Sequence, residues 1–177
     1  QFFVAYTGII RMTLLEGRNL PNQGGALDKQ DPYVRLVLEA GEGSGKKQVA
    51  RGKTVNDGGT DPSFGREQLL LWCSDDAMFK GLTLELWDDD VGRDDCIGKL
   101  EVSLFEYAAL RMNSTASPCM RNFMLVKNDV PEGELIAVIE FLPAAELQIT
   151  CLKGRELRNP NFFGTADPYL FFEGESQ

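Results

Sequence analysis

The chain has 177 residues, 43% of them hydrophobic, with a formal net charge of −9 from 27 acidic and 18 basic side chains. This length allows one medium domain with a sizeable core and part of another, and no run approaches the ~20 apolar residues of a membrane helix. The acidic balance argues against nucleic acid and against constitutive adhesion to anionic membranes, and the absence of histidine excludes histidine-dependent triads and histidine–metal sites.

Along the chain, the hydrophobic pattern predicts about eight short strands. Apolar and polar residues alternate with the period of a half-buried strand, and loops rich in Gly, Pro, Asn and Asp separate the segments. The predicted strands are 8–20, 33–39, 48–55, 67–73, 82–87, 98–104, 121–126 and 133–142, with a short turn over 76–81 and a short helix over 104–112. This pattern is typical of an all-β, eight-stranded antiparallel β-sandwich.

Five carboxylates fall within eight positions directly after the strand at 82–87. They are Asp88 to Asp90 and Asp94 to Asp95. Because like charges repel at such short spacing, carboxylates packed this densely usually share a cation. Oxygen ligands without histidine or thiolate nearby favour a hard ion, calcium before magnesium. The alternative interpretation is a solvated acidic turn.

The end of the chain repeats its beginning. Residues 146–157 echo 10–20, and Asp167-Pro-Tyr-Leu then echoes Asp31-Pro-Tyr-Val at nearly equal spacing, which indicates an internal repeat. An isolated hairpin is marginal in water, so we expect the repeated segment to pack on the first domain or to pair with a second copy of the chain, giving a dimer. The predicted organisation is a linker at 1–7, a complete domain at 8–142, a linker at 143–145 and the first hairpin of a second domain at 146–177.

Three ordered motifs resemble the C2 domain family, the calcium- and lipid-binding modules of protein kinase C and the synaptotagmins. The motifs are Leu-Glu-Gly-Arg-Asn-Leu followed by Asp31-Pro-Tyr-Val-Arg, then Thr60-Asp-Pro-Ser-Phe-Gly-Arg-Glu, and finally Leu-Trp-Asp-Asp-Asp followed by Asp-Asp-Cys-Ile-Gly. The likeness spans residues 8–142. It implies a C2-like antiparallel β-sandwich with the synaptotagmin-like topology.

The resemblance also implies a set of calcium ligands in three loops at one end of the sandwich. The family uses five acidic side chains, and four of these positions carry over: Asp31, Asp88, Asp90 and Asp95. Asp94 competes with Asp95 for the last position. The fifth position is Gly25 here, and Asp28, three residues later, is a partial substitute. This departure predicts fewer ions or weaker binding, because calcium affinity follows ligand charge.

Docking on anionic phospholipid membranes is the mechanism that the resemblance implies. Bound calcium cancels the charge of the loops and leaves coordination sites for lipid phosphate oxygens, so adsorption is electrostatic. Leu27 and Val91 are the apolar loop tips. Four cations form a predicted basic strand face: Lys46, Lys47, Arg51 and Lys53. This face is either a phosphoinositide site, as in some relatives, or a solvated edge whose charges protect it from pairing with strands of other molecules.

Two functions remain as hypotheses. The first is a calcium-dependent phospholipid-binding module of a larger membrane-trafficking or signalling protein. The second is a calcium-insensitive protein-interaction or scaffold module, with Gly25 as the mark of a degraded site. We expect no enzymatic activity, since no nucleophile–base pair is visible. The four cysteines lack metal-type spacing, and we expect a cytoplasmic protein that is peripheral on the cytosolic face of membranes.

Overall fold

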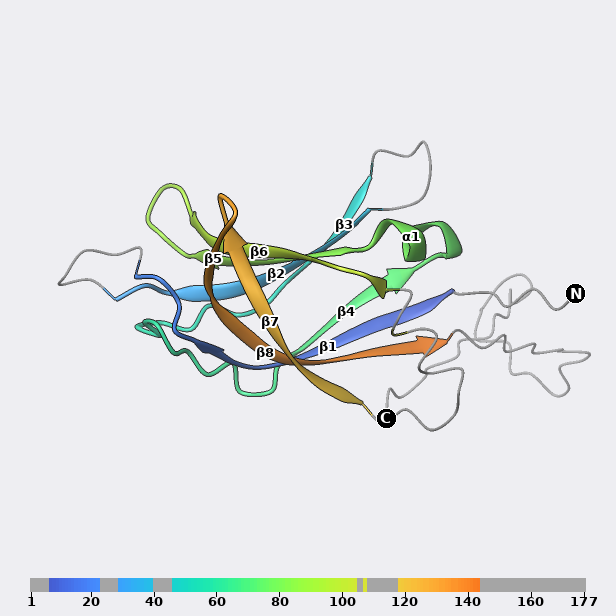
Figure 1. Ribbon diagram of the computed structural model, residues 1–177, viewed down its shortest axis with the longest axis horizontal. Helices are drawn as coiled ribbons and strands as arrows, with labels where there is room; N and C mark the ends of the chain where they lie inside the picture. Colours follow the sequence, from blue (N-terminus) through green and yellow to red (C-terminus); the bar gives the residue numbers. More distant parts are fainter. Residues whose placement is uncertain (1–6, 23–28, 40–45, 105–106, 108–117, 144–177) are drawn as a thin grey trace, which may run out of the picture. The chain divides into compact units, whose positions relative to one another are not determined.

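The computed structural model in Figure 1 describes residues 7–22, 29–39, 46–104, 107 and 118–143. The chain divides into two units, 1–144 and 145–177, and the second lies outside the described residues. The hairpin predicted at 146–177, its pairing with a second copy, and most of the helix predicted over 104–112 also fall outside them. The described part of the chain contains no helix long and apolar enough to cross a membrane.

Leu104 and Tyr107 are helical in the described structure. Eight strands and one further short helix have their bounds within it, and the strands confirm the predicted all-β class. Their bounds are β1 Gly8–Arg18, β2 Pro32–Glu39, β3 Lys47–Arg51, β4 Gln68–Cys73, α1 Asp75–Lys80, β5 Leu82–Asp88, β6 Asp95–Val102, β7 Cys119–Lys127 and β8 Val130–Pro143.

The helix α1 corrects the prediction of a turn over 76–81. Ser74 is its N-cap, and the Ser74 Oγ accepts a hydrogen bond from the backbone N of Ala77 at 3.4 Å. Gly81, with φ of 82°, follows the last helical residue. A helix of six residues is too short for the helical period to show in the sequence, and burial of Ala77 and Met78 against the core stabilises it.

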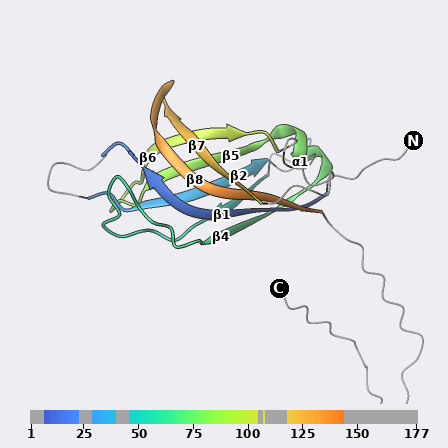
Figure 2. The ribbon, with the colours of Figure 1, turned by 60° about the horizontal axis from the view of Figure 1, so that its bottom comes forward.

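The strands are hydrogen-bonded in the order β3-β2-β5-β6-β7-β8-β1-β4. Within the described residues, β6 and β7 pair at a single position, where Lys99 lies opposite Val126. The sheet therefore folds at this seam into two layers of four strands, β3-β2-β5-β6 and β7-β8-β1-β4 (Figures 1 and 2). The result is the antiparallel sandwich expected from the strand pattern.

The core lies between the two layers and follows the alternation read from the sequence. In β5 the side chains of Leu82, Leu84 and Leu86 are fully buried, and the residues between them are partly exposed. Strands β1 and β2 complete the centre of this core with aliphatic side chains: Ile10, Met12, Leu14, Val34, Leu36 and Leu38. Burial of this apolar surface is the main force that holds the layers together.

Candidate functional site

Three connecting segments meet at one end of the sandwich, at the left of Figure 1. They are the β1–β2 segment at 19–31, the β3–β4 segment at 52–67 and the β5–β6 segment at 89–94. Backbone hydrogen bonds join them, because the N of Asp89 donates to the O of Asp31 at 3.1 Å and the N of Gly59 donates to the O of Gln30 at 3.0 Å. The predicted loop residues Leu27 and Asp28 lie outside the described residues.

Asp31 and Asp88 are neighbours where β2 begins and β5 ends. Asp88 is only 3% exposed, and its Oδ1 accepts a hydrogen bond from the backbone N of Asp31 at 2.6 Å. The Oδ1 of Asp31 accepts in turn from the backbone N of Asp57 at 2.6 Å. Asp31 therefore joins all three segments. The participation of Asp57 was not predicted, since no motif in the sequence marks it.

The strand register brings another carboxylate close to Asp88. Asp95 opens β6 directly opposite Asp88, and opposite residues of an antiparallel pair have Cβ atoms about 4.5–5.5 Å apart. Asp90 is exposed and lies two residues after Asp88, at the start of the loop. Asp31, which directly precedes β2, thus lies with Asp88 of β5 and Asp95 of β6 at one end of one layer.

The two remaining carboxylates of the loop belong to a separate network. The Oδ2 of Asp94 accepts a hydrogen bond from the hydroxyl of Tyr33 at 2.7 Å. The Oδ2 of Asp89 accepts from the Nη2 of Arg51 at 2.7 Å and from the hydroxyl of Thr54. Of the two candidates for the last ligand, this contact of Asp94 with Tyr33 favours Asp95.

The pKa shifts in this network follow from its hydrogen bonds. The Thr54 hydroxyl and the Arg51 guanidinium hold the pKa of Asp89 below its usual value. Burial, together with the hydrogen bond to Asp94, raises the pKa of Tyr33 above its usual value. At neutral pH Asp89 is therefore a carboxylate and Tyr33 a hydrogen-bond donor.

The donor chemistry fits calcium, because carboxylates supply only oxygen ligands. Within the described ranges, however, no group of three or more acidic, thiol or imidazole side chains is placed to hold a metal ion. The set Asp31, Asp88, Asp90 and Asp95 therefore stays a predicted ligand set.

The residues of the predicted basic face lie on β3 and directly beside it. The Nζ of Lys47 is 3.5 Å from the Oε1 of Glu39, and Arg51 forms an ion pair with Asp89, so a carboxylate offsets the charge of each of these two cations. Lys46 and Lys53 are exposed. Because β3 ends the strand order, these charges also suit an edge protected from pairing. Both interpretations of this face stay predictions.

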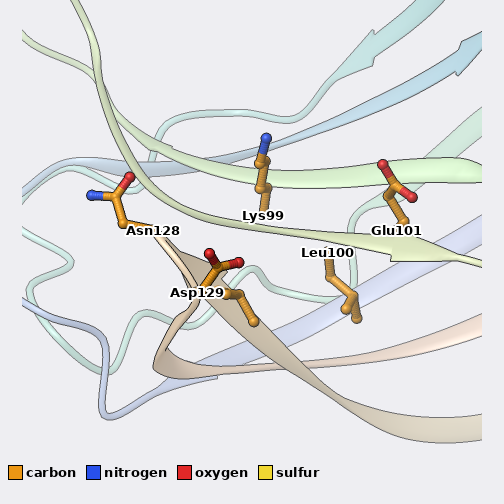
Figure 3. A pocket seen from close by; sticks show the side chains of 6 residues that line it. Lys99, Leu100, Glu101, Asn128 and Asp129 are labelled. Atoms are coloured by element: carbon orange, nitrogen blue, oxygen red, sulfur yellow. The ribbon is translucent and has the colours of Figure 1, made fainter.

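A hollow at the seam of the two layers is separate from the acidic loops. It has a volume of about 360 Å³ and lies where β6 and β7 diverge. Figure 3 shows Lys99 and Glu101 on one side of β6 and Leu100 on the other, as strand alternation requires. The lining mixes both signs of charge: Lys99, Leu100, Glu101, Val126, Asn128 and Asp129. This mixture does not define a binding site for one kind of ligand.

The described structure is an antiparallel β-sandwich with carboxylate-bearing loops gathered at one end. The family model of the C2 domain matches residues 8–119, and the chain belongs to the C2 domain family. This confirms the resemblance read from the three motifs.

Synaptotagmins are among its similar relatives. Human Synaptotagmin-9 is 30% identical over 145 residues, which cover 79% of this chain and 28% of that protein. Rat Synaptotagmin-9 is 29% identical over the same shares. The chain thus spans less than a third of the length of these relatives.

Similar solved structures support the fold. A calcium-bound structure of two C2 domains of Extended-Synaptotagmin 2 matches with a TM-score of 0.60 and 23% identity, covering 80% of this chain and 48% of that chain. A single C2 domain of plant Extended Synaptotagmin 1 matches with a TM-score of 0.60 and 16% identity, covering 78% of this chain and 97% of that chain.

Proposed function

We propose that this C2 domain is a calcium-dependent phospholipid-binding module of a longer membrane-trafficking or signalling protein. The observation that carries the proposal is the arrangement at the strand ends, where Asp88 is hydrogen-bonded to Asp31 and lies opposite Asp95. The similarity to Synaptotagmin-9 and to a calcium-bound C2 structure supports it. In this proposal the domain has no catalytic role and acts at the cytosolic face of membranes.

Charge explains how such a module would work. Without calcium, the acidic loops repel anionic headgroups, and the net charge of −9 adds to that repulsion. Calcium held by Asp31, Asp88, Asp90 and Asp95 would neutralise the negative charge of the loops. It would also offer coordination sites for lipid phosphate oxygens. The protein's own contribution is to hold these carboxylates at the ends of rigid strands.

A second candidate function is a calcium-insensitive interaction module. Two observations favour it: Gly25 replaces an acidic position of the family pattern, and the described carboxylates do not converge on a metal site. In this case the acidic loops would contact a protein partner instead of a lipid.

Calorimetric titration of calcium into the metal-stripped chain separates the two functions. We expect saturable binding that becomes tighter with phosphatidylserine vesicles and is unchanged by phosphatidylcholine vesicles, because the anionic headgroup completes the coordination. A titration without heat, together with no sedimentation on anionic vesicles, would leave the second function.

Val91 provides a test of membrane insertion by the loop tip. Its side chain is fully exposed between Asp90 and Gly92, so it gains contacts only if the tip enters an apolar phase. We expect Val91→Ser to weaken calcium-dependent vesicle binding roughly fivefold, since partial burial of a valine contributes about 1 kcal/mol. Calcium affinity without vesicles is expected to stay the same.

The matched control is Leu70→Ser, a similarly apolar change at an exposed position of β4. If both variants bind vesicles like the wild type, the loop tip does not insert.

A further inference from the structure

Arg51 contacts the start of the β5–β6 loop, and the ring of Tyr33 links it to the end of that loop. Its Nη2 donates to the Oδ2 of Asp89 at 2.7 Å, at the start of the loop. Its guanidinium carbon also lies 3.8 Å from the centre of the Tyr33 ring. The Tyr33 hydroxyl donates to Asp94 at 2.7 Å, at the end of the loop. Arg51 on β3 thus contacts Asp89 directly and is connected to Asp94 through the side chain of Tyr33.

Asp89 and Asp94 are the immediate neighbours of predicted calcium ligands. Asp89 lies between Asp88 and Asp90, and Asp94 precedes Asp95. Successive side chains of extended backbone point to opposite sides. Asp88, the last residue of β5, accordingly points to the other side of the strand from Asp89 and accepts a hydrogen bond from the backbone N of Asp31.

The strength of this network comes from several contacts that share one cation. The Arg51 and Asp89 side chains are 45% and 38% exposed, and an isolated ion pair with that exposure contributes little. Here the same guanidinium also stacks on an aromatic ring and donates to the Thr54 hydroxyl at 3.1 Å. A planar guanidinium can make these contacts together, because its donors are fixed in one plane.

We propose that Arg51 is a positioning residue for calcium binding: through Asp89 and the Tyr33–Asp94 hydrogen bond, it orders the β5–β6 loop before the ion binds. This inference rests on the proposed function. It also gives Arg51 a role different from the lipid-facing one that the strand pattern suggested.

Whether calcium binding becomes weaker or tighter when Arg51 loses its charge distinguishes a positioning role from a purely electrostatic one. A cation beside the loop repels calcium, so Coulomb's law alone predicts tighter calcium binding when Arg51 loses its charge. A positioning role predicts weaker binding, because a loop that must be ordered on binding lowers the affinity.

The test is calcium titration of four variants of the whole chain. We expect Arg51→Gln to weaken calcium binding about fivefold, and Arg51→Lys to restore part of the loss because it keeps a cation beside Asp89. Tyr33→Phe, which changes no charge, is expected to weaken binding in the same direction. Arg121→Gln is the matched control, since it removes the same charge from an exposed position on β7. Unchanged or tighter binding in Arg51→Gln overturns the inference.

A second measurement needs no calcium. In the metal-free chain, we expect faster amide hydrogen exchange at 89–94 in Arg51→Gln and Tyr33→Phe, and wild-type exchange in Arg121→Gln. Equal exchange in all variants overturns the inference, even if the wild type binds calcium. A wild-type chain that binds no calcium overturns the proposed function instead, and the exchange rates then decide separately whether Arg51 anchors the loop.

Discussion

Asp88→Asn is expected to lower calcium affinity roughly tenfold or more, with little change in the fold. Asparagine has the same shape as aspartate, and its Oδ1 can still accept the hydrogen bond that Asp88 receives from the backbone N of Asp31. The variant therefore removes charge and keeps the local geometry. Calcium affinity depends on the number of charged ligands, so one lost carboxylate weakens binding, and adding Asp90→Asn is expected to abolish it. Calorimetric titration of the metal-stripped chain measures both effects.

Without metal, Asp88→Asn is not expected to destabilise the protein. Removing one of several neighbouring carboxylates relieves repulsion, so the free energy of unfolding in chelator should stay the same or rise. Glu101→Gln is the charge-matched control, because Glu101 is exposed near the far end of β6. Equal calcium affinity in Asp88→Asn and Glu101→Gln would remove Asp88 from the ligand set. A large loss of stability without metal would show that Asp88 serves the fold.

Gly133→Ala is expected to lower the free energy of unfolding by about 3 kcal/mol. Gly133 has a φ of 85°, a conformation that residues with a Cβ adopt at a cost. A Cβ at this position would lie 2.6 Å from the carbonyl O of Asn19 and 2.8 Å from that of Arg18. Both atoms belong to the backbone at the end of β1, so no side-chain rotation relieves the overlap. Urea unfolding measured by tryptophan fluorescence gives the difference.

Gly65→Ala separates backbone conformation from steric overlap. Gly65 has a φ of 61°, but nothing lies within 4 Å of the position of its Cβ. This control is expected to cost about 1 kcal/mol, the cost of the left-handed conformation alone. If the two variants lose the same stability, the close approach of β8 to the end of β1 contributes nothing.

The strands and the core face could be predicted from the sequence, because alternation is a local property. Leu82, Leu84 and Leu86 recur every second residue and face the core, and this spacing alone sorts a strand into a buried and an exposed side. The three motifs likewise identify the C2 family, since each is a short run at a set place along the chain. The helix α1 was missed because six residues hold less than two helical turns.

The partners of the remaining carboxylates in the acidic loop could not be predicted. The resemblance selects Asp88 and Asp90 as ligands, but it gives Asp89 no partner and leaves Asp94 in competition with Asp95. The structure separates them through partners that are distant along the chain: Arg51 for Asp89, 38 residues away, and Tyr33 for Asp94, 61 residues away.

The sequence by itself thus determined the eight strands, their buried faces and the family of this protein. Only the tertiary structure decided which carboxylates are held by cations and hydroxyls of other strands, and which remain at the strand ends near Asp31. Such choices depend on the register of β2 against β5 and of β5 against β6. Register is set by pairing across the sheet, and a shift of one residue would exchange the buried and exposed sides of the shifted strand.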